Sequence, residues 1–319
     1  MNFAVAGAGA IGAYVGAKMA RAGADVTLVA RGRHCRAMQE RGVRVVSAEE
    51  EFETRPRVVD SVAAVGPVDV VFLAVKAHSL PELAPQLPAL FGPDTAVVSM
   101  QNGIPWWYFE ATERLEKVDP GGVVAAAIEP RRVVGSIVYL STENIEPGVV
   151  RHMESNRITI GEPDGARSER CRVIAEVLVS AGLRAPITTH LRQEIWVKLM
   201  GNVAFNPISA LTGATLAAMA RDPEVGQLVR AIMAETECVA RRIGIEMPIT
   251  IDQRITGAEK VGEHKTSMLQ DLEAGRPLEL DAIVGAVLEL GARSQIPMPH
   301  TRAVYACAKL LERRRGGRP

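Results

Sequence analysis

Two kinds of hydrophobic pattern divide this chain of 319 residues. From about residue 190, apolar residues recur at helical spacing, and Gly and Pro separate successive helical segments. Before that point, short apolar runs alternate with glycine turns and helical segments, which is typical of strands in a doubly wound sheet. We therefore expect an α/β fold with a Rossmann-type domain in residues 1–186 and an all-helical domain in residues 187–319. The predicted strands are 1–6, 25–30, 68–75, 95–100 and further β-rich runs between 121 and 161; the predicted helices are 191–205, 223–243, 249–274, 278–293 and 299–314.

The first predicted strand leads directly into a glycine-rich turn, GAGAIG, and a helix and a second strand follow it. This order of elements is the context that the dinucleotide-binding fingerprint requires. Gly7 permits the tight turn, Gly9 lets the backbone approach a pyrophosphate, and Gly12 lets the helix pack closely on the strand. The N-terminus of the helix offers amides and a positive dipole end to phosphate. The predicted cofactor-binding residues of this turn are Gly7, Ala8, Gly9, Ala10, Ile11 and Gly12.

The end of the second strand indicates which nicotinamide cofactor binds. NAD-binding versions of this fold carry an acidic residue there, which accepts a hydrogen bond from the ribose 2′-hydroxyl. Here the sequence is Ala30-Arg31-Gly32-Arg33, and a guanidinium group suits a 2′-phosphate. The prediction is NADP(H), bound in part by Arg31; a solvated basic turn is the alternative.

Two later strands also end in polar residues. Lys76 follows the strand at 68–75, and Asn102 follows the strand at 95–100. The carboxyl ends of parallel strands border the ligand crevice in doubly wound sheets. Both side chains are therefore placed to reach the cofactor or the substrate, although a surface lysine and an ordinary Asn-Gly turn are the simpler interpretations.

The segment IWVKLMGNVAFNP carries a polar stripe on an otherwise apolar helix. Lys198, Asn202 and Asn206 recur at steps of four, which places them along one face. A lysine ammonium can protonate the alkoxide that hydride transfer leaves on a ketone, and asparagine amides can orient the substrate. Gly201 between them suggests a close approach by backbone or ligand. The alternatives are a surface pair of Lys198 with Glu194 and helix capping by Asn206.

A second polar group follows at Ser267 and Glu279. A carboxylate beside the lysine would hold the ammonium and favour its charged form. The residues alone do not bring these groups to Lys198, and a solvated helix face is the alternative.

Composition excludes several other classes of function. Lys and Arg total 37, as do Asp and Glu, so no global field favours nucleic acid or a membrane surface. The four cysteines lie far apart without metal-ligand spacing, so we predict no metal site and reduced thiols in the cytoplasm. No apolar run reaches the roughly 18 residues of a membrane helix.

The order and spacing of these motifs resemble the ketopantoate reductase (2-dehydropantoate 2-reductase) family over nearly the whole chain. The resemblance lies in GAGAIG at 7–12, LVAR ending at Arg31, AVKA around Lys76, QNG around Asn102, KLMGNVAFNP at 198–207, SMLQD at 267–271 and ELD at 279–281. It implies a second domain similar to the C-terminal domain of 6-phosphogluconate dehydrogenase. The implied enzyme is an NADP-dependent oxidoreductase that reduces 2-dehydropantoate to (R)-pantoate, a step toward pantothenate and coenzyme A.

The resemblance also implies a role for each matching position. Lys198 is then the proton donor. The substrate-binding residues are Asn102, Asn202, Asn206 and Ser267, and the cofactor contacts beyond the glycine turn are Arg31, Lys76, Asn102 and Glu279. Leu216 stands where some members carry another substrate-binding Asn, which leaves another branched 2-oxo acid open as substrate. A β-hydroxyacid dehydrogenase and an NADPH-sensing binding protein are the further alternatives, and the helical domain is the expected surface for a homodimer.

Overall fold

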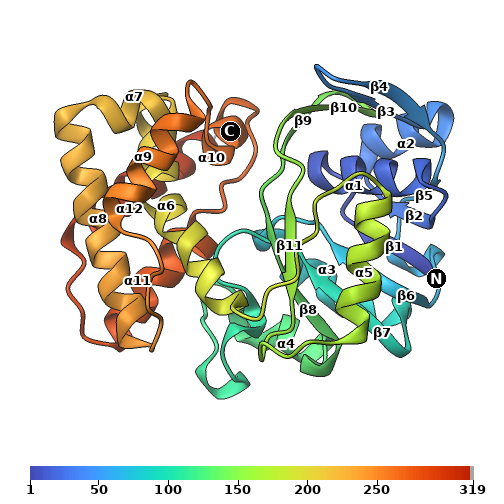
Figure 1. Cartoon of the computed structure of the whole chain (residues 1–319), viewed down its shortest axis with the longest axis horizontal. Helices are drawn as coiled ribbons and strands as arrows, with labels where there is room; N and C mark the ends of the chain where they lie inside the picture. Colours follow the sequence, from blue (N-terminus) through green and yellow to red (C-terminus); the bar gives the residue numbers. More distant parts are fainter. Residues whose placement is uncertain (317–319) are drawn as a thin grey trace. The chain divides into compact units, whose positions relative to one another are not determined.

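The computed structural model describes residues 1–316, which form two compact units (Figure 1). The first unit contains residues 1–101 and 121–191. The second contains residues 102–120 and the chain from Arg192 onward. An α/β unit with a mostly parallel sheet and a helical unit confirm the predicted fold class. A single boundary after residue 186 does not anticipate that residues 102–120 leave the first unit and join the second.

The first unit is built on a seven-stranded sheet with the order β11-β8-β7-β6-β1-β2-β5. Its neighbouring strands are parallel except β11, which runs antiparallel to β8. The chain moves from β1 to β2 on one side and later to β6 on the other, so the strand order reverses at β1. Ligands of doubly wound sheets bind at the carboxyl ends of the strands beside such a reversal. The strands are β1 Asn2–Ala6, β2 Asp25–Val29, β5 Arg57–Val59, β6 Val68–Leu73, β7 Phe91–Ser99, β8 Val133–Val138 and β11 Ile158–Gly161.

A second sheet has the order β4-β3-β10-β9. The β-rich run at 148–153 was expected to complete the main sheet, and that expectation is wrong because it forms β10, which pairs with β3 on one side and with β9 on the other. The predicted strand at 123–128 is also wrong, since its valine and alanine residues form a short helix after the left-handed Gly122; alanine is the strongest helix former. The strands of the second sheet are β3 Val43–Val46, β4 Glu51–Thr54, β9 Ser141–Glu146 and β10 Val149–Glu154, and the helices of the unit are α1 Ala10–Arg21, α2 Gly32–Arg41, α3 Leu80–Leu83, α4 Val123–Ala127 and α5 Glu169–Ser180.

The longest helix of the described chain is α6 (Leu191–Thr212), which belongs to the helical unit from Arg192 onward. The predicted break at Asn206-Pro207 is wrong, because the helix continues through Pro207. Proline costs a helix one hydrogen bond and adds a steric clash, but Phe205 and Ile208 are almost fully buried, and this packing holds the segment helical. The remaining helices are α7 Leu216–Arg221, α8 Pro223–Arg242, α9 Ile251–Val261, α10 Ser267–Glu273, a π-helix at Asp281–Gly285, α11 Ala286–Arg293 and α12 Pro299–Gly316.

The single helix predicted over 249–274 is two helices in the structure. Gly262 ends α9 with a φ of +83°, a conformation that glycine adopts without strain. Thr266 then begins α10, since its hydroxyl accepts a hydrogen bond from the Leu269 amide at 3.2 Å. Ser267 is thereby the first residue of a new helix and does not lie inside a continuous one.

A buried carboxylate fixes α5 to the main sheet. Glu162, just after β11, accepts hydrogen bonds from Arg170 Nη2 at 2.5 Å and from Ser168 Oγ at 2.5 Å. Arg170 Nη2 also donates to the Val133 carbonyl of β8 at 3.1 Å. Burial alone raises the pKa of Glu162, but the hydrogen bonds from Arg170 and Ser168 outweigh burial and lower the pKa below its usual value.

We expect Glu162→Gln to lower the free energy of unfolding at pH 7 by about 1–3 kcal/mol, because Arg170 loses a charged partner. A carboxylate with a lowered folded-state pKa stabilises the protein above its unfolded pKa of about 4.3, and this contribution disappears as the pH falls through the folded pKa. Chemical denaturation at pH 7 and at acidic pH therefore finds a difference from wild type that shrinks on acidification. Glu169→Gln is the control, since its pair with Arg172 is exposed; an equal loss in the two variants contradicts the assignment.

Candidate active site

The glycine turn in the first unit has the close packing that its sequence requires. Gly7 has a φ of +102°, and a Cβ there would lie 2.5 Å from Val75 Cγ1 and 2.6 Å from the Val75 amide nitrogen. A Cβ on Gly12 would overlap the Gly7 carbonyl oxygen and lie 3.0 Å from Val5 Cγ1. Neither position accepts a side chain: Gly7 lets the turn pack against Val75 just after β6, and Gly12 lets α1 pack against the turn and β1.

Gly9 differs from these two glycines because nothing lies within 4 Å of the position of its Cβ. It is exposed and directly precedes α1, which begins at Ala10. Ala8, Ala10 and Ile11 complete the turn, and the Ala8 amide donates to the Val29 carbonyl of β2 at 2.8 Å. The open side of the turn is therefore at the N-terminus of a helix, where backbone amides and the helix dipole favour an anion.

Arg31 and Lys76 follow the carboxyl ends of β2 and β6, two strands that flank β1. Because these strands are parallel, their carboxyl ends share one edge of the sheet with the glycine turn. Arg31 precedes α2, is exposed, and its Nη1 lies 3.5 Å from a carboxylate oxygen of the exposed Glu82. An exposed ion pair of this kind is weak, so the guanidinium is available to a stronger anion such as a phosphate.

The second unit brings together three of the predicted site residues. Lys198 Nζ donates to Asn102 Oδ1 at 2.7 Å, and Asn102 Nδ2 donates to Glu279 Oε2 at 3.3 Å. An ammonium only donates and a carboxylate only accepts, so these two partners fix the orientation of the amide between them. Lys198 comes from α6, Asn102 from the 102–120 segment, and Glu279, only 4% exposed, from the residues just before the π-helix.

The 102–120 segment is held on the π-helix beside Glu279. Gly103 has a φ of +90°, and a Cβ there would overlap the Ala282 carbonyl oxygen and lie 2.7 Å from the Ala282 carbonyl carbon. The next amide, on Ile104, donates to that same carbonyl at 3.3 Å. The glycine therefore allows the contact that positions Asn102. π-Helical turns occur frequently at functional sites.

A charged group centred on Asp281 attaches the same segment to α12. Tyr305 Oη and Lys309 Nζ donate to the Asp281 carboxylate at 2.5 and 2.7 Å, and Lys117 Nζ lies 3.3 Å from it. Burial alone raises the pKa of Asp281, but hydrogen bonds from Lys309 and Tyr305 outweigh burial and lower it. The carboxylate thus stays ionised two residues after Glu279.

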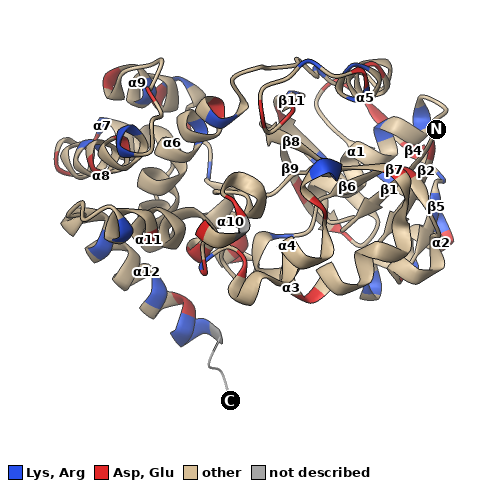
Figure 2. Cartoon of the chain, turned by 90° about the horizontal axis from the view of Figure 1, so that it is seen from below, with Lys and Arg blue, Asp and Glu red and all other residues tan. Residues whose placement is uncertain are grey.

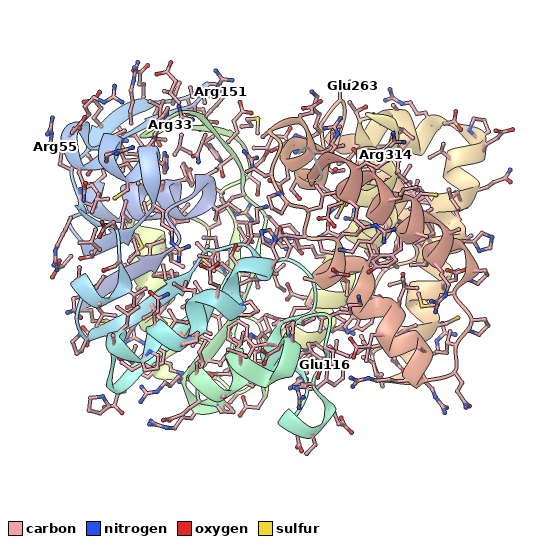
Figure 3. The ribbon with its side chains drawn as sticks, turned by 180° about the vertical axis from the view of Figure 1, so that it is seen from behind. Arg33, Arg55, Glu116, Arg151, Glu263 and Arg314 are labelled. Carbon is pink, nitrogen blue, oxygen red and sulfur yellow. The ribbon has the colours of Figure 1, made fainter. Side chains whose placement is uncertain are left out.

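The far end of the segment is fixed to α11. The Glu116 amide donates to Glu289 Oε1 at 3.0 Å, and Arg293 Nη1 donates to the Glu113 carbonyl at 2.8 Å. Figure 3 labels Glu116, which marks this end of the segment. These bonds tie residues 102–120 to the helical unit at both ends.

The aromatic run after Asn102 packs on α6. Trp106, Trp107 and Tyr108 are all less than 10% exposed. Trp196 Nε1 donates to Tyr108 Oη at 3.0 Å, and burial raises the pKa of the Tyr108 hydroxyl to about 12. The aromatic segment is therefore part of the core of the helical unit.

Two further residues of the polar stripe lie on α6 after Lys198. Asn206 is 5% exposed and Asn202 is half-buried. Because α6 continues to Thr212, Asn206 does not cap a helix end, and that alternative is removed. Ser267 is exposed at the start of α10 and is not among the residues that the structure brings to Lys198. The roles of Asn202, Asn206 and Ser267 toward a substrate remain predictions.

Other kinds of site find no support within residues 1–316. No group of three His, Cys, Asp or Glu side chains there could hold a metal ion. The described helices include none that is long and apolar enough to cross a membrane. Basic and acidic residues are both scattered over the ribbon, and the last turn of α12 is basic (Figure 2).

Comparison with known proteins identifies the same family in both parts of the chain. The family model described as ketopantoate reductase PanE/ApbA matches residues 3–165, and the model for its C-terminal part matches residues 190–312. A 2-dehydropantoate 2-reductase from Mesorhizobium japonicum is 49% identical over 99% of both chains.

Solved structures agree with this result. The crystal structure of 2-dehydropantoate 2-reductase from Methylococcus capsulatus has a TM-score of 0.85 and 32% identity, and the match covers 100% of this chain and 99% of that one. A crystal structure from Ralstonia solanacearum has a TM-score of 0.93 and 38% identity, covering 99% and 98%. These matches confirm the resemblance inferred from the motifs: the chain belongs to the ketopantoate reductase family.

Proposed function

We propose that this protein is an NADPH-dependent reductase that converts 2-dehydropantoate to (R)-pantoate. The observation that carries the proposal is the hydrogen-bonded group of Lys198, Asn102 and Glu279 in a member of this family. The close relative from Mesorhizobium japonicum bears the name of this activity. The enzyme would act in the cytoplasm on a small 2-oxo acid, with the helical unit as the surface of a homodimer.

The chemistry follows from what each group can do. When bound, NADPH would supply a hydride for the carbonyl carbon of the 2-oxo acid, which would leave negative charge on the carbonyl oxygen. The Lys198 ammonium stabilises that charge and gives its proton to the oxygen, so that the product is a 2-hydroxy acid. Asn102 holds the ammonium in a defined orientation, and Glu279 in turn holds Asn102.

The glycine turn is the proposed site of the pyrophosphate. Its exposed Gly9 and the start of α1 offer backbone amides, while Gly7 and Gly12 allow the close packing beneath them. Arg31 supplies the positive charge that a 2′-phosphate requires. Lys76, after β6 on the other side of β1, is a further proposed cofactor contact.

The test is NADPH oxidation by the purified protein across a panel of 2-oxo acids. We expect the highest kcat/KM with 2-dehydropantoate and lower values with other branched 2-oxo acids. A higher kcat/KM for another 2-oxo acid would identify that acid as the substrate and leave the proposed reaction type unchanged. Tight NADPH binding without turnover of any panel member would instead favour a binding protein, and oxidation of 3-hydroxy acids with NADP+ would favour a β-hydroxyacid dehydrogenase.

Arg31→Ala tests the choice of cofactor. We expect the KM for NADPH to rise about 10- to 100-fold, because charge-assisted bonds to the phosphate are lost, while the KM for NADH stays nearly unchanged. Steady-state kinetics with both cofactors measure the difference. Arg55→Ala is the control, since Arg55 is an exposed arginine of the same unit beyond β4 (Figure 3); equal effects of Arg31→Ala on the two cofactors contradict the role of Arg31.

A further inference from the structure

A half-buried histidine, His34, lies in the first turn of α2 and joins two parts of the first unit. Its Nδ1 accepts a hydrogen bond from the Gly148 amide at 3.0 Å. Because a backbone amide only donates, Nδ1 carries no proton, and the proton of the neutral ring is on Nε2. The ring therefore directs its one donor away from Gly148.

The partner of Nδ1 is itself held firmly. Gly148 is buried in the turn between β9 and β10, and its carbonyl accepts from the Arg44 amide of β3 at 2.9 Å. The preceding carbonyl, of Pro147, accepts from Arg41 Nη2 at the end of α2 at 3.3 Å. The β9–β10 turn is thus a fixed support for the imidazole of His34.

The other side of the ring faces the glycine turn. Nε2 of His34 is buried and makes no hydrogen bond of normal geometry within residues 1–316. The backbone of Ala8, the second residue of the turn, lies close enough to raise the pKa of the ring, but burial has the larger effect and lowers that pKa below its usual value. A backbone group that favours the charged ring is an acceptor, so it is the Ala8 carbonyl that faces the N–H of Nε2.

The Ala8 carbonyl belongs to the peptide unit that leads into Gly9, the open position of the turn. The Gly9 amide donates to the Gly7 carbonyl at 2.8 Å, and the Ala8 amide donates to the Val29 carbonyl at 2.8 Å. A donor beside the Ala8 carbonyl adds a third restraint on this peptide unit. Glycine-rich backbone loses much conformational entropy when a ligand orders it, so a turn that is already restrained binds with less cost.

We propose that His34 is a positioning residue of the dinucleotide site, whose neutral imidazole supports the glycine turn from the β9–β10 turn in the shape that a pyrophosphate requires. The inference rests on the proposed function, because it takes NADP(H) as the ligand of the glycine turn. It gives the second sheet a part in cofactor binding, since that sheet carries the support for the turn.

His34→Asn separates the two sides of the ring. The asparagine Oδ1 takes the place of Nδ1 and accepts from Gly148, but the side chain is too short to place a donor at the position of Nε2. We expect the Kd for NADP+ to rise by about 2- to 12-fold, the range for one ordinary hydrogen bond, with thermal stability close to wild type. Calorimetric titration and thermal unfolding measure the two quantities, and an unchanged Kd overturns the proposal.

The choice of dinucleotide identifies the part of the cofactor that His34 serves. NAD+ has the same pyrophosphate as NADP+ and lacks only the 2′-phosphate, so in His34→Asn the Kd for NAD+ should rise by the same factor. This result differs from that expected for Arg31→Ala, which affects only the phosphorylated cofactor. A rise confined to NADP+ would place the effect of His34 at the 2′-phosphate and would overturn its role at the turn.

Two further variants complete the test. His34→Gln places an amide nitrogen near the position of Nε2 and should return the Kd toward the wild-type value; a Kd as high as that of His34→Asn overturns the role of the donor. His152→Ala is the control, because His152 is a histidine of β10 whose ring stacks on Tyr14 of α1 with centroids 4.7 Å apart. It should lose thermal stability and keep its Kd, and an equal rise in Kd would show that any weakening of the second sheet moves the turn, which overturns the assignment to His34.

These binding measurements separate this inference from the proposed function. Wild-type protein that binds neither NADP+ nor NADPH contradicts the proposed function itself. Wild-type protein that binds NADP+ while His34→Asn binds it equally well overturns only the role of His34. Turnover of a 2-oxo acid enters neither comparison.

Discussion

Replacing Lys198 with alanine is expected to lower kcat for reduction of the 2-oxo acid by about 10²- to 10⁴-fold, the contribution typical of a positioned general acid. Alanine removes both the proton and the positive charge that stabilise the developing alkoxide. The affinity for NADPH should stay nearly the same, because the proposed pyrophosphate site is the glycine turn of the other unit. Single-turnover absorbance at the NADPH band measures the chemical step, and fluorescence titration measures cofactor binding.

Lys265→Ala is the matched control for this variant. Lys265 is also in the helical unit, but it pairs with Glu273 on the surface, with half of its side chain exposed. Its loss should leave kcat near the wild-type value. Undiminished turnover in Lys198→Ala would remove Lys198 from the mechanism, and a large fall in NADPH affinity would assign it to cofactor binding instead.

The parts of this site that depend on neighbouring residues were accessible from the sequence. The glycine turn is a local structure: its tight turn, its open Gly9 and its packed Gly12 all follow from six consecutive residues and the strand before them. The stripe of Lys198, Asn202 and Asn206 is also local, because helical geometry alone aligns them.

The parts that depend on distant residues were not accessible in this way. Asn102 and Lys198 are 96 residues apart, and Asn102 and Glu279 are 177 apart. Because Asn102 follows a strand, the sequence predicted that it borders the ligand crevice of the sheet. In the structure Asn102 belongs instead to the segment 102–120, which leaves the sheet and joins the helical unit. Only the family resemblance linked these three side chains before the structure did.

The predicted helix boundaries were wrong where buried packing outweighed residues that locally favour a helix end. Asn206-Pro207 has the residues of a helix end, but the buried surface of α6 keeps the helix intact to Thr212. Gly201 was expected to allow a close approach by backbone or ligand, but the group that lies against it is the side chain of Arg254 from α9, which no spacing rule could identify. A glycine inside an apolar helix predicts that another group packs closely against it, but the sequence does not identify that group.

The second large expected effect is a loss of kcat when the contact between Gly103 and the π-helix is disturbed. In Gly103→Ala the new Cβ would lie 2.7 Å from the Ala282 carbonyl carbon and overlap its oxygen, so backbone must move against backbone. Asn102 is the adjacent residue and moves with it, away from Lys198 or Glu279. Since a displacement of about 1 Å in an active site can cost 10²-fold in rate, we expect kcat to fall by about 100-fold.

Gly213→Ala isolates the cause of this loss. Gly213 also belongs to the helical unit and has a φ of +74°, but nothing lies within 4 Å of the position of its Cβ. Both variants carry the strain of a left-handed alanine, roughly 1–2 kcal/mol, and both should lose thermal stability. Only Gly103→Ala should lose catalysis, because only there does the methyl group displace the segment that holds Asn102. Equal kcat values in the two variants would show that the position of Asn102 tolerates this shift and that Lys198 acts without it.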